Sequence, residues 1–299
     1  MNFTTASTLD EALAAVASGA RPIAGGSDLV VGARHGKTPM PDSLVAIDRI
    51  GSLGYIEATV DGVRIGALVT HARLEIDDEI VDHYTGLADA SALVGSPATR
   101  NVGTIGGNVM NASPAMDTGA PLLVLGAEVE LQSTTGSRRI AVGDLWTGPG
   151  RTSAAHGELC VAVHLPTRPP MSGSAYVRLE YRRAMEIAVV GAAASVRLDE
   201  AGALAALSVA LTAVAPTIIA VHGTDALLGR QVDDALLAEI ADLASEQASP
   251  ISDVRASDRY RRHCIGVMAR RAVDAAARRA RGESISVPVN RSLGIGASS

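Results

Sequence analysis

TIGGNVMNASPAMD, residues 104–117, is the stretch that says most about the fold of this chain, and PIAGGSDL, residues 22–29, is its upstream counterpart. Each contains two adjacent glycines, which allow positive φ and a close approach of the backbone to a ligand. Successive main-chain amides of this kind form a concave anion site suited to a diphosphate. Ser27, Thr104 and Asn108 add side-chain donors at the same places. Neither segment has the GxGxxG spacing of a Rossmann fold, so the residues predict a nucleotide or cofactor site of another kind.

The composition favours a globular protein that binds neither nucleic acid nor membrane. The 299 residues are enough for two ordinary domains or one large one, and 47% of them are hydrophobic. Aromatic residues make up only 2% and the net charge is −6, which argues against nucleic-acid binding. No apolar run reaches the roughly 20 residues of a membrane helix, and Asp10 and Glu11 stand where a signal peptide would be apolar. We therefore expect a cytoplasmic protein.

Cysteine and histidine usage predicts no metal site on this chain. The two cysteines, Cys160 and Cys264, are too few for an iron–sulfur cluster, which usually takes about four cysteine ligands. They form no CxxC pair, and the seven histidines are scattered without metal-ligand spacing and are interpreted as structural or exposed. If the protein transfers electrons, its metal clusters must belong to a different chain.

Local signals predict the first elements of the chain. Thr8 and Glu11 form a capping box that starts a helix ending at Gly19. Asp61-Gly62 is a strong hairpin signal between two strand-like runs. Further elements expected here are strands over 21–24, 43–47 and 159–165, a helix or turn over 28–33, helices starting at Thr70 and over 85–94 and 120–125, and a hairpin at Thr135-Gly136.

Two later segments organise the rest of the chain. Residues 95–117 show neither helical nor strand periodicity, and a loop of that length is usually functional. Prolines cluster around 167–173 and mark the expected domain boundary. Beyond it we expect strands over 188–198 and 204–214, helices over 217–228, 233–246 and 257–281, and a flexible end over 291–299. The arginines of the last helix, Arg279 among them, are interpreted as a solvated face or a subunit contact.

Taken together, these motifs closely resemble the FAD-binding subunit of the xanthine dehydrogenase and carbon monoxide dehydrogenase family. The resemblance rests on SPATRNVGTIGGN at 96–108, continued by ASPAMD at 112–117, and on AGGSDL at 24–29. Further matching segments are GPGRT at 148–152, YRRAMEIAVV at 181–190 and SDVR at 252–255. The similarity extends from about Phe3 to Ala280, and the order and spacing of the motifs make it specific.

The resemblance implies an α/β (α+β) fold. The N-terminal FAD domain would be of the vanillyl-alcohol-oxidase (PCMH) type, with two α/β subdomains and the cofactor between them. The C-terminal α/β domain would consist of a sheet backed by helices, in agreement with the elements expected above. We accordingly expect the FAD-binding domain over residues 1–168, the C-terminal domain over 169–285 and a flexible tail over 286–299.

The resemblance also implies the FAD site. Arg21 to Asp28 would line the diphosphate and adenosine side, and Thr104 to Asn108 would form the second diphosphate loop. Asp117 would bind the ribityl hydroxyls, and Cys160 or Val161 would present backbone to the flavin ring. The expected FAD-binding residues are Arg21, Pro22, Ile23, Ala24, Gly25, Gly26, Ser27, Asp28, Leu29, Val94, Thr104, Ile105, Gly106, Gly107, Asn108, Ser113, Asp117, Cys160, Val161 and Arg178.

Two of these positions depart from the family pattern. Arg178 stands where several relatives have a lysine near the isoalloxazine. A fixed cation there would favour the anionic reduced flavin, but an arginine does not lose its proton and so is no practical proton donor. Val94 stands where some relatives have an aromatic ring that stacks on the flavin.

In the family, a large subunit carries the molybdenum cofactor and hydroxylates the substrate, and a small subunit with two 2Fe–2S clusters passes electrons on. The flavin delivers them to an external acceptor such as NAD, a quinone or oxygen, and the cofactor itself supplies the chemistry. The resemblance therefore implies an oxidoreductase subunit that carries FAD within a dimer of heterotrimers. No catalytic residue is expected on this chain.

Two other functions stay open. A stand-alone flavoenzyme of the same fold would need an aromatic or acid–base wall over the flavin, and no such residues stand out in the sequence. A nucleotide-binding or assembly module without a redox role would be colourless when purified and would take up no FAD.

Overall fold

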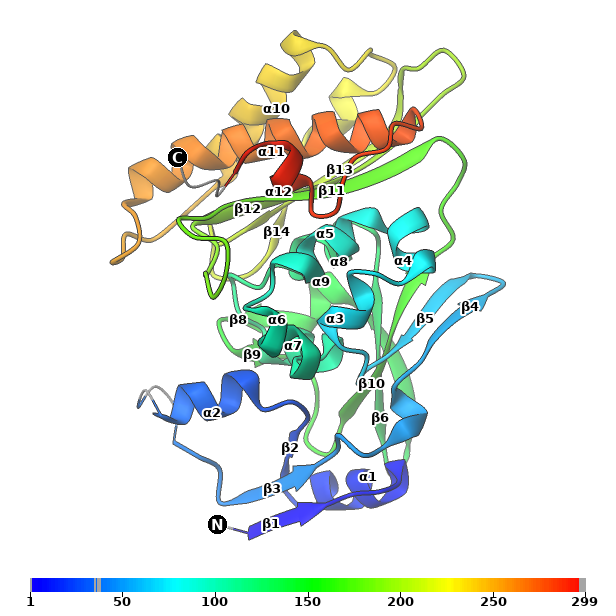
Figure 1. Ribbon diagram of the computed structural model, residues 1–299, viewed down its shortest axis with the longest axis vertical. Helices are drawn as coiled ribbons and strands as arrows, with labels where there is room; N and C mark the ends of the chain where they lie inside the picture. The colour runs from blue at the N-terminus through cyan, green and yellow to red at the C-terminus, as the bar shows by residue number, and fades with distance from the viewer. Residues whose placement is uncertain (1, 35, 37–38, 296–299) are drawn as a thin grey trace.

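The computed structural model describes residues 2–34, 36 and 39–295, and Figure 1 shows three parts along its long axis. A small sheet with two helices lies at the N-terminal end, a larger region of strands and short helices lies in the middle, and the C-terminal sheet with its helices lies at the other end. The predicted mixed α/β class is confirmed. Within the described residues, no helix is long and apolar enough to cross a membrane.

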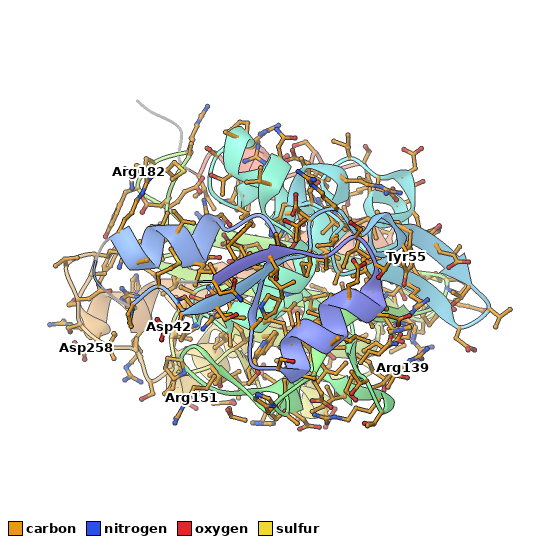
Figure 2. The ribbon with its side chains drawn as sticks, turned by 90° about the horizontal axis from the view of Figure 1, so that it is seen from below. Asp42, Tyr55, Arg139, Arg151, Arg182 and Asp258 are labelled. Carbon is orange, nitrogen blue, oxygen red and sulfur yellow. The ribbon has the colours of Figure 1, made fainter. Side chains whose placement is uncertain are left out.

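The first subdomain is a parallel three-stranded sheet with two helices, and Figure 2 views the molecule from this end. Its elements are β1 (Asn2–Thr5), β3 (Ser43–Ala46), β2 (Arg21–Ile23), α1 (Leu9–Ala17) and α2 (Ser27–Arg34). The predicted capping box is confirmed: the Thr8 hydroxyl accepts a hydrogen bond from the Glu11 amide at 3.3 Å, and the Glu11 carboxylate accepts one from the Thr8 amide at 3.2 Å. Leu13 and Val16 on the inner face of α1 are buried in one hydrophobic cluster. Ala24, which directly precedes the glycine turn, packs against this cluster.

The second subdomain combines an antiparallel five-stranded sheet with a group of short helices. In sheet order, its strands are β4 (Ile56–Thr59), β5 (Gly62–Gly66), β10 (Leu159–Pro166), β6 (Glu128–Ser133) and β7 (Gly136–Ala141). Its other elements are η1 (Gly51–Leu53), α3 (His71–Leu74), α4 (Asp78–His83), α5 (Thr85–Leu93), α6 (Pro97–Val102), α7 (Ile105–Asn111), α8 (Gly119–Val124), α9 (Val142–Leu145), β8 (Trp146–Gly148) and β9 (Arg151–Thr152). The hairpins predicted at Asp61-Gly62 and Thr135-Gly136 are confirmed.

The C-terminal domain is an antiparallel sheet covered by two long helices (Figure 1), as the resemblance implied. Its elements are β11 (Ser172–Leu179), β12 (Val190–Leu198), β13 (Leu204–Thr212), β14 (Ile219–Ala220), η2 (Thr224–Leu227), α10 (Asp234–Gln247), α11 (Asp258–Ala280) and α12 (Val289–Ser292). An alanine-rich side of α11 is buried against the sheet. The approach is so close that a Cβ added at Gly173 of β11 would lie 2.2 Å from the Ala276 carbonyl oxygen.

Residues 95–117, predicted as a loop, instead contain the helices α6 and α7. These helices have six and seven residues, which is too short for a hydrophobic period to be recognised. Their N-caps are side chains: Ser96 accepts a hydrogen bond from the Thr99 amide at 3.2 Å, and Thr104 accepts one from the Gly107 amide at 3.1 Å. The local signals of these helices were therefore the capping residues and Pro97 at the first position of α6.

Two predictions for the C-terminal part are also wrong. Residues 217–228 form no α-helix, because Ile219–Ala220 pairs with the sheet as β14 and Gly223, at φ +87°, interrupts the chain before η2. The chain does not become a free tail at residue 286, because α12 is docked on β11. There the Asn290 side chain exchanges two hydrogen bonds with the Arg178 backbone, at 3.2 and 3.0 Å. Residues 296–299 of the expected tail lie outside the described residues.

A buried carboxylate joins the N-terminal and C-terminal parts of the molecule. Asp89 of α5 accepts hydrogen bonds from the Arg279 guanidinium, the closest at 2.6 Å, and from the amides of Tyr176 and Val289 at 3.1 and 2.9 Å. The neighbouring arginines suggested that Arg279 belongs to a solvated face. Its side chain is instead buried in the ion pair with Asp89. Its charge is satisfied by a residue 190 positions away.

Candidate functional site

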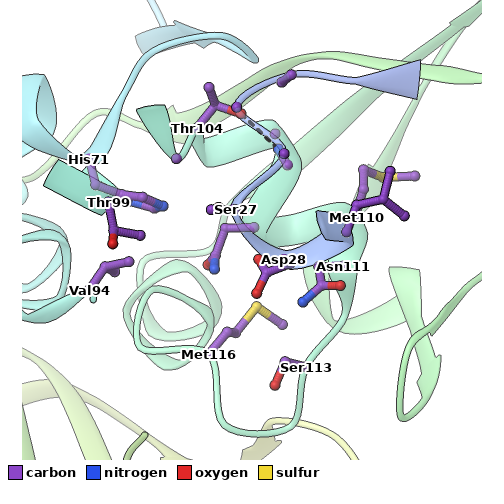
Figure 3. Close-up of a pocket in the computed structure, with 18 of the residues that line it drawn as sticks. Ser27, Asp28, His71, Val94, Thr99, Thr104, Met110, Asn111, Ser113 and Met116 are labelled. Atoms are coloured by element: carbon purple, nitrogen blue, oxygen red, sulfur yellow. Dashed lines mark hydrogen bonds between the residues drawn. The ribbon is translucent and has the colours of Figure 1, made fainter. Parts of the chain in front are cut away.

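A cavity of about 720 Å³, shown in close-up in Figure 3, lies between the two N-terminal subdomains. Met185, Glu186 and Ile187 of the segment that follows β11 also line it. Its size falls within the roughly 300–1,000 Å³ that is usual for cofactor sites. Both glycine segments line it, as do Val94, Ser113, Asp117 and Cys160. All the predicted FAD-binding residues are among its lining residues except Ile105, Val161 and Arg178.

The first glycine segment presents free main-chain donors to this cavity. Gly26 has a φ of +68°, a left-handed conformation that turns the chain from β2 into α2. Among the described residues, no acceptor pairs with the amides from Gly25 to Leu29. These amides open an eight-residue helix, and the positive end of its dipole also attracts an anion. The segment therefore fits a diphosphate.

The second glycine segment approaches the first through the junction between α6 and α7. A Cβ added at Gly25 would lie 1.8 Å from the Val102 carbonyl oxygen and 3.2 Å from the Gly103 nitrogen. A Cβ added at Gly103 would in turn lie 3.6 Å from the Ser27 hydroxyl oxygen. The two segments are 77 positions apart at Gly25 and Val102, yet their backbones are in direct contact.

The amides from Ile105 to Asn108 in the second segment are already paired, which corrects the expectation of bare donors there. The Ile105 amide donates to the Val69 carbonyl at 2.9 Å, and the Gly106 amide donates to the Ala67 carbonyl at 3.0 Å. The Gly107 amide donates to the Thr104 hydroxyl at 3.1 Å, shown as the dashed line in Figure 3. This segment is a capped helix that shapes the wall of the cavity.

The two glycines of this second pair have different surroundings. A Cβ added at Gly106 would lie 2.6 Å from the Ala67 Cβ and 2.8 Å from the Ala67 carbonyl oxygen, so Gly106 is required for packing. A Cβ added at Gly107 would meet only the Thr104 hydroxyl, at 3.0 Å. Gly107 is exposed to the cavity, so a side chain there would occupy cavity volume.

Asp117 lies at the cavity wall and is held by two residues of β11. The Tyr176 hydroxyl donates to one carboxylate oxygen at 2.8 Å, and the Arg178 guanidinium donates to the other at 2.7 Å. Each carboxylate oxygen keeps a further lone pair for a ligand hydroxyl. The two donors therefore fix the carboxyl group, which presents acceptors to the cavity.

Arg178 lies behind Asp117 and not at the cavity surface. Its side chain has no exposed area, and its guanidinium pairs with both Asp117 and Glu180 at 2.7 Å. Burial alone would lower the pKa of Arg178, but the charges of Asp117 and Glu180 outweigh it and raise the pKa above its ordinary value. Arg178 does not line the cavity, because its two carboxylate partners hold the side chain in the protein interior, and its expected place near the flavin ring stays a prediction.

Strand β10 contributes one of its two predicted residues to the cavity. Cys160 lines it, at an irregularity in the pairing of β10 with β6. Burial raises the pKa of the Cys160 thiol to about 12, so it is uncharged at neutral pH. The Val161 carbonyl accepts a hydrogen bond from the Ala67 amide at 3.0 Å, and this carbonyl is already paired within the protein.

Sequence reasoning missed several residues that line the cavity, notably His71 and the segment Met185 to Ile187. The Met185 amide donates to the Gly95 carbonyl at 2.8 Å, and Met185 has a φ of +53°. The labelled Arg182 places this segment on the same side of the molecule as α2 (Figure 2). The segment belongs to YRRAMEIAVV, residues 181–190, whose resemblance to the family was the signal that could have assigned it to the site.

The charges around the cavity are mostly paired. Asp117 pairs with Arg178, Glu158 with Arg138 at 2.6 Å and Glu186 with Arg182 at 3.3 Å. Asp28 has no ion pair among the described residues. Solvent reaches it through the cavity, but the surrounding walls desolvate it and raise the pKa of its carboxyl. With Arg21 as the positive side chain at the cavity, the α2 amides provide much of the attraction for an anion.

Comparison with known families identifies both parts of the chain. The family described as the FAD binding domain in molybdopterin dehydrogenase matches residues 1–168, and the carbon monoxide dehydrogenase flavoprotein C-terminal domain matches residues 175–276. The chain therefore belongs to the family of FAD-binding subunits of xanthine and carbon monoxide dehydrogenase-type molybdenum hydroxylases. It is an oxidoreductase subunit.

Individual relatives cover nearly the whole chain. The xanthine dehydrogenase FAD-binding subunit of Escherichia coli is 32% identical over 94% of this chain and 98% of its own length. The carbon monoxide dehydrogenase medium chain of Afipia carboxidovorans is 35% identical over 88% of this chain and 90% of its own length. A crystal structure of the Cu,Mo-CO dehydrogenase superposes with a TM-score of 0.88 at 32% identity, over 93% of this chain and 98% of the other.

Proposed function

We propose that this chain binds FAD in the cavity between its N-terminal subdomains and relays electrons from a partner subunit to an external acceptor. The diphosphate would lie at the free amides of Gly25 to Leu29, and Asp117 would accept hydrogen bonds from the ribityl hydroxyls. The flavin ring would lie toward Cys160 and the Met185 segment. These placements are supported by the residues that line the cavity.

One observation carries the proposal: free amides at the start of α2 lie where the two glycine segments meet. The backbones at Gly25 and Val102 are in direct contact, with no room for a side chain at Gly25. The contact holds the free amides in one place before a ligand binds, and such preorganisation reduces the entropy lost on binding. A site of this kind suits a cofactor that stays bound during turnover.

Bound FAD would supply the change between one-electron and two-electron transfer, and the chain orients it and controls its surroundings. Asp117, fixed by Tyr176 and Arg178, would hold the ribityl chain in one orientation. Cys160 would present a neutral wall, because its thiol keeps its proton. None of these residues acts as a general base toward an organic substrate.

We further propose that the electrons arrive from two 2Fe–2S clusters on a small partner subunit, and that a large partner subunit holds the molybdenum cofactor and hydroxylates the substrate. The carbon monoxide dehydrogenase relatives are named medium chains, which supports such partners. NAD, a quinone or oxygen would accept the electrons, and the assembly would be a dimer of heterotrimers. A cytoplasmic location and the domain limits 1–168 and 169–285 stay predictions.

The test compares the full chain alone with the chain co-purified with its partner subunits. The chain alone should be yellow, contain about one FAD per chain and react with NADH or a redox dye. Oxidation of an organic substrate should require the partners. A colourless chain that takes up no FAD would overturn the proposal, and substrate oxidation by the yellow chain alone would favour a stand-alone flavoenzyme.

A further inference from the structure

His71 is a buried cavity residue that no part of the proposed function uses. It is the first residue of α3, is 1% exposed and lines the cavity. Its ring Nδ1 has no hydrogen-bond partner among the described residues. Nδ1 itself is inaccessible, but Nε2, which is bonded to Cδ2, also makes no side-chain hydrogen bond among the described residues. Nε2 is therefore the ring nitrogen that a ligand in the cavity would complete.

The ring lies next to the place where the two glycine segments meet. The His71 amide donates to the Gly103 carbonyl at 3.0 Å. A Cβ added at Gly103 would lie 3.3 Å from His71 Cδ2 and 3.6 Å from the Ser27 hydroxyl oxygen, so the ring and the start of α2 flank the same Gly103. Figure 3 shows His71, Ser27 and Thr104 around this part of the cavity.

The charged groups around the ring leave it without a counter-ion. On α6, Arg100 pairs with Glu75, the residue after α3, at 3.1 Å. Arg73 of α3 pairs with Asp77 at 3.7 Å.

The elements that pack on the other sides add no free anion next to the ring. On α5, Asp89 is occupied by Arg279. Across the cavity, Asp28 of α2 is a carboxyl whose pKa is raised by desolvation, and no ion pair joins it to His71 among the described residues. Burial and, next, the charge of Arg100 lower the pKa of His71 to about 4, so the ring is neutral at physiological pH.

We propose that the His71 imidazole is a further FAD-binding group, which donates a hydrogen bond to the diphosphate and takes up a proton from solvent when the nucleotide binds. This inference rests on the proposed location of FAD in the cavity. The diphosphate is the part of FAD that carries negative charge, and it would lie at the α2 amides beside the ring. Its charge supplies the counter-ion that the protein itself does not provide.

The sign of the expected pH dependence follows from linkage. FAD binding raises the pKa of His71 above its value in the FAD-free protein, so binding takes up protons between the two values and weakens as pH rises. If bound phosphate restores only the ordinary pKa of about 6.5, the Kd for FAD should rise about tenfold from roughly pH 5.5 to pH 8. Above the pKa of the complex the dependence should vanish.

The experiment is a calorimetric titration of the FAD-free full chain with FAD, in two buffers of different ionisation enthalpy at about pH 6. The wild-type chain should take up protons on binding. His71→Gln keeps an amide donor but cannot be protonated in this range, so its proton uptake and the pH dependence of its Kd should be smaller. Asp28→Asn is the matched variant, because the Asp28 carboxyl is the one carboxyl at the cavity without an ion pair among the described residues. This variant should keep the proton uptake that is due to His71. ADP, which carries a diphosphate without the flavin, should show the same dependence on His71.

Several outcomes would contradict the inference. Equal proton uptake by the wild-type chain and His71→Gln, or none by the wild type, would remove His71 from the site while leaving FAD binding intact. Absence of any FAD binding would instead overturn the proposed function itself. If His71→Gln does not fold, the His71 ring can be titrated by NMR in the wild-type chain, where a pKa unchanged by FAD would refute the proposal.

Discussion

The two glycine pairs look equivalent in the sequence, but the structure gives them different tasks. Gly25 and Gly26 turn the chain into α2 and leave its first amides free at the cavity. Gly106 and Gly107 lie inside α7, where the amides are paired with Ala67 and with the capping Thr104. Under the proposed function the first pair would bind through its backbone, whereas the second allows a helix to pack closely and leaves cavity volume free.

The difference shows that two adjacent glycines in a binding motif can be required for different physical reasons. An anion site needs unpaired amides, and only the first pair leaves them. The second pair is constrained by sterics: Gly106 by Ala67, and Gly107 by the volume that a ligand would occupy. Substitutions at the four positions should therefore have separable effects on folding and on FAD content.

Gly25→Ala should have the largest effect, on both stability and FAD content. Its Cβ would lie 1.8 Å from the Val102 carbonyl oxygen, and both atoms are fixed by backbone, so the two segments must separate. The separation should destabilise the fold by about 3 kcal/mol or more and abolish the anion site. Thermal unfolding and the ratio of flavin to protein measure both effects.

Gly51→Ala is the matched control, because a Cβ there meets nothing within 4 Å and the residue is not at the cavity. It should keep its flavin and its melting temperature. A Gly25→Ala chain with a full complement of FAD would show that the contact between the two segments is not needed for binding.

Gly107→Val should remove FAD without loss of stability. Its Cβ would meet only the Thr104 hydroxyl, and valine is better tolerated in a helix than glycine, so the melting temperature should not fall. The branched side chain would fill cavity volume and raise the Kd for FAD at least tenfold, about 1.4 kcal/mol. Fluorescence titration with FAD measures the change, and normal affinity would place the cofactor elsewhere.

Gly106→Ala should show the opposite pattern, with stability reduced more than affinity. Its Cβ would overlap the Cβ and the carbonyl of Ala67, and the strain should cost about 1–3 kcal/mol. Folded protein at low temperature should still take up FAD, because the α2 amides are untouched. Loss of FAD at an unchanged melting temperature would mean that Gly106, like Gly107, borders the ligand.

The sequence allowed the prediction of features that depend on neighbouring residues. The Thr8 capping box, the Asp61-Gly62 hairpin and the long helix α11 all have local signals, and all are confirmed. Both glycine segments were found in the same way, and the resemblance placed them in one site, whose lining they share.

Features that depend on distant contacts could not be predicted in this way. Glu180, two positions away, pairs with Arg178, but nothing in the sequence indicates the second partner Asp117, 61 positions away, or the burial of this ion pair behind the cavity wall. His71 is an ordinary histidine until the fold buries it beside Gly103. The paired amides of α7 depend on carbonyls of the segment after β5, which no local pattern reveals.

Thr104→Val should have the smallest effect on stability and FAD affinity. It tests most directly which of the two glycine segments binds the diphosphate. It removes the hydroxyl that accepts from the Gly107 amide, and loss of an N-cap costs about 1 kcal/mol. Thr104→Ser keeps the hydroxyl and should retain the stability. The valine variant also frees the Gly107 amide, so FAD affinity should change less than tenfold if the α2 amides bind the diphosphate. A much larger loss of affinity in the valine variant alone would mean that the Thr104 hydroxyl contacts FAD directly, and the second segment would then bind the nucleotide as well as shape its cavity.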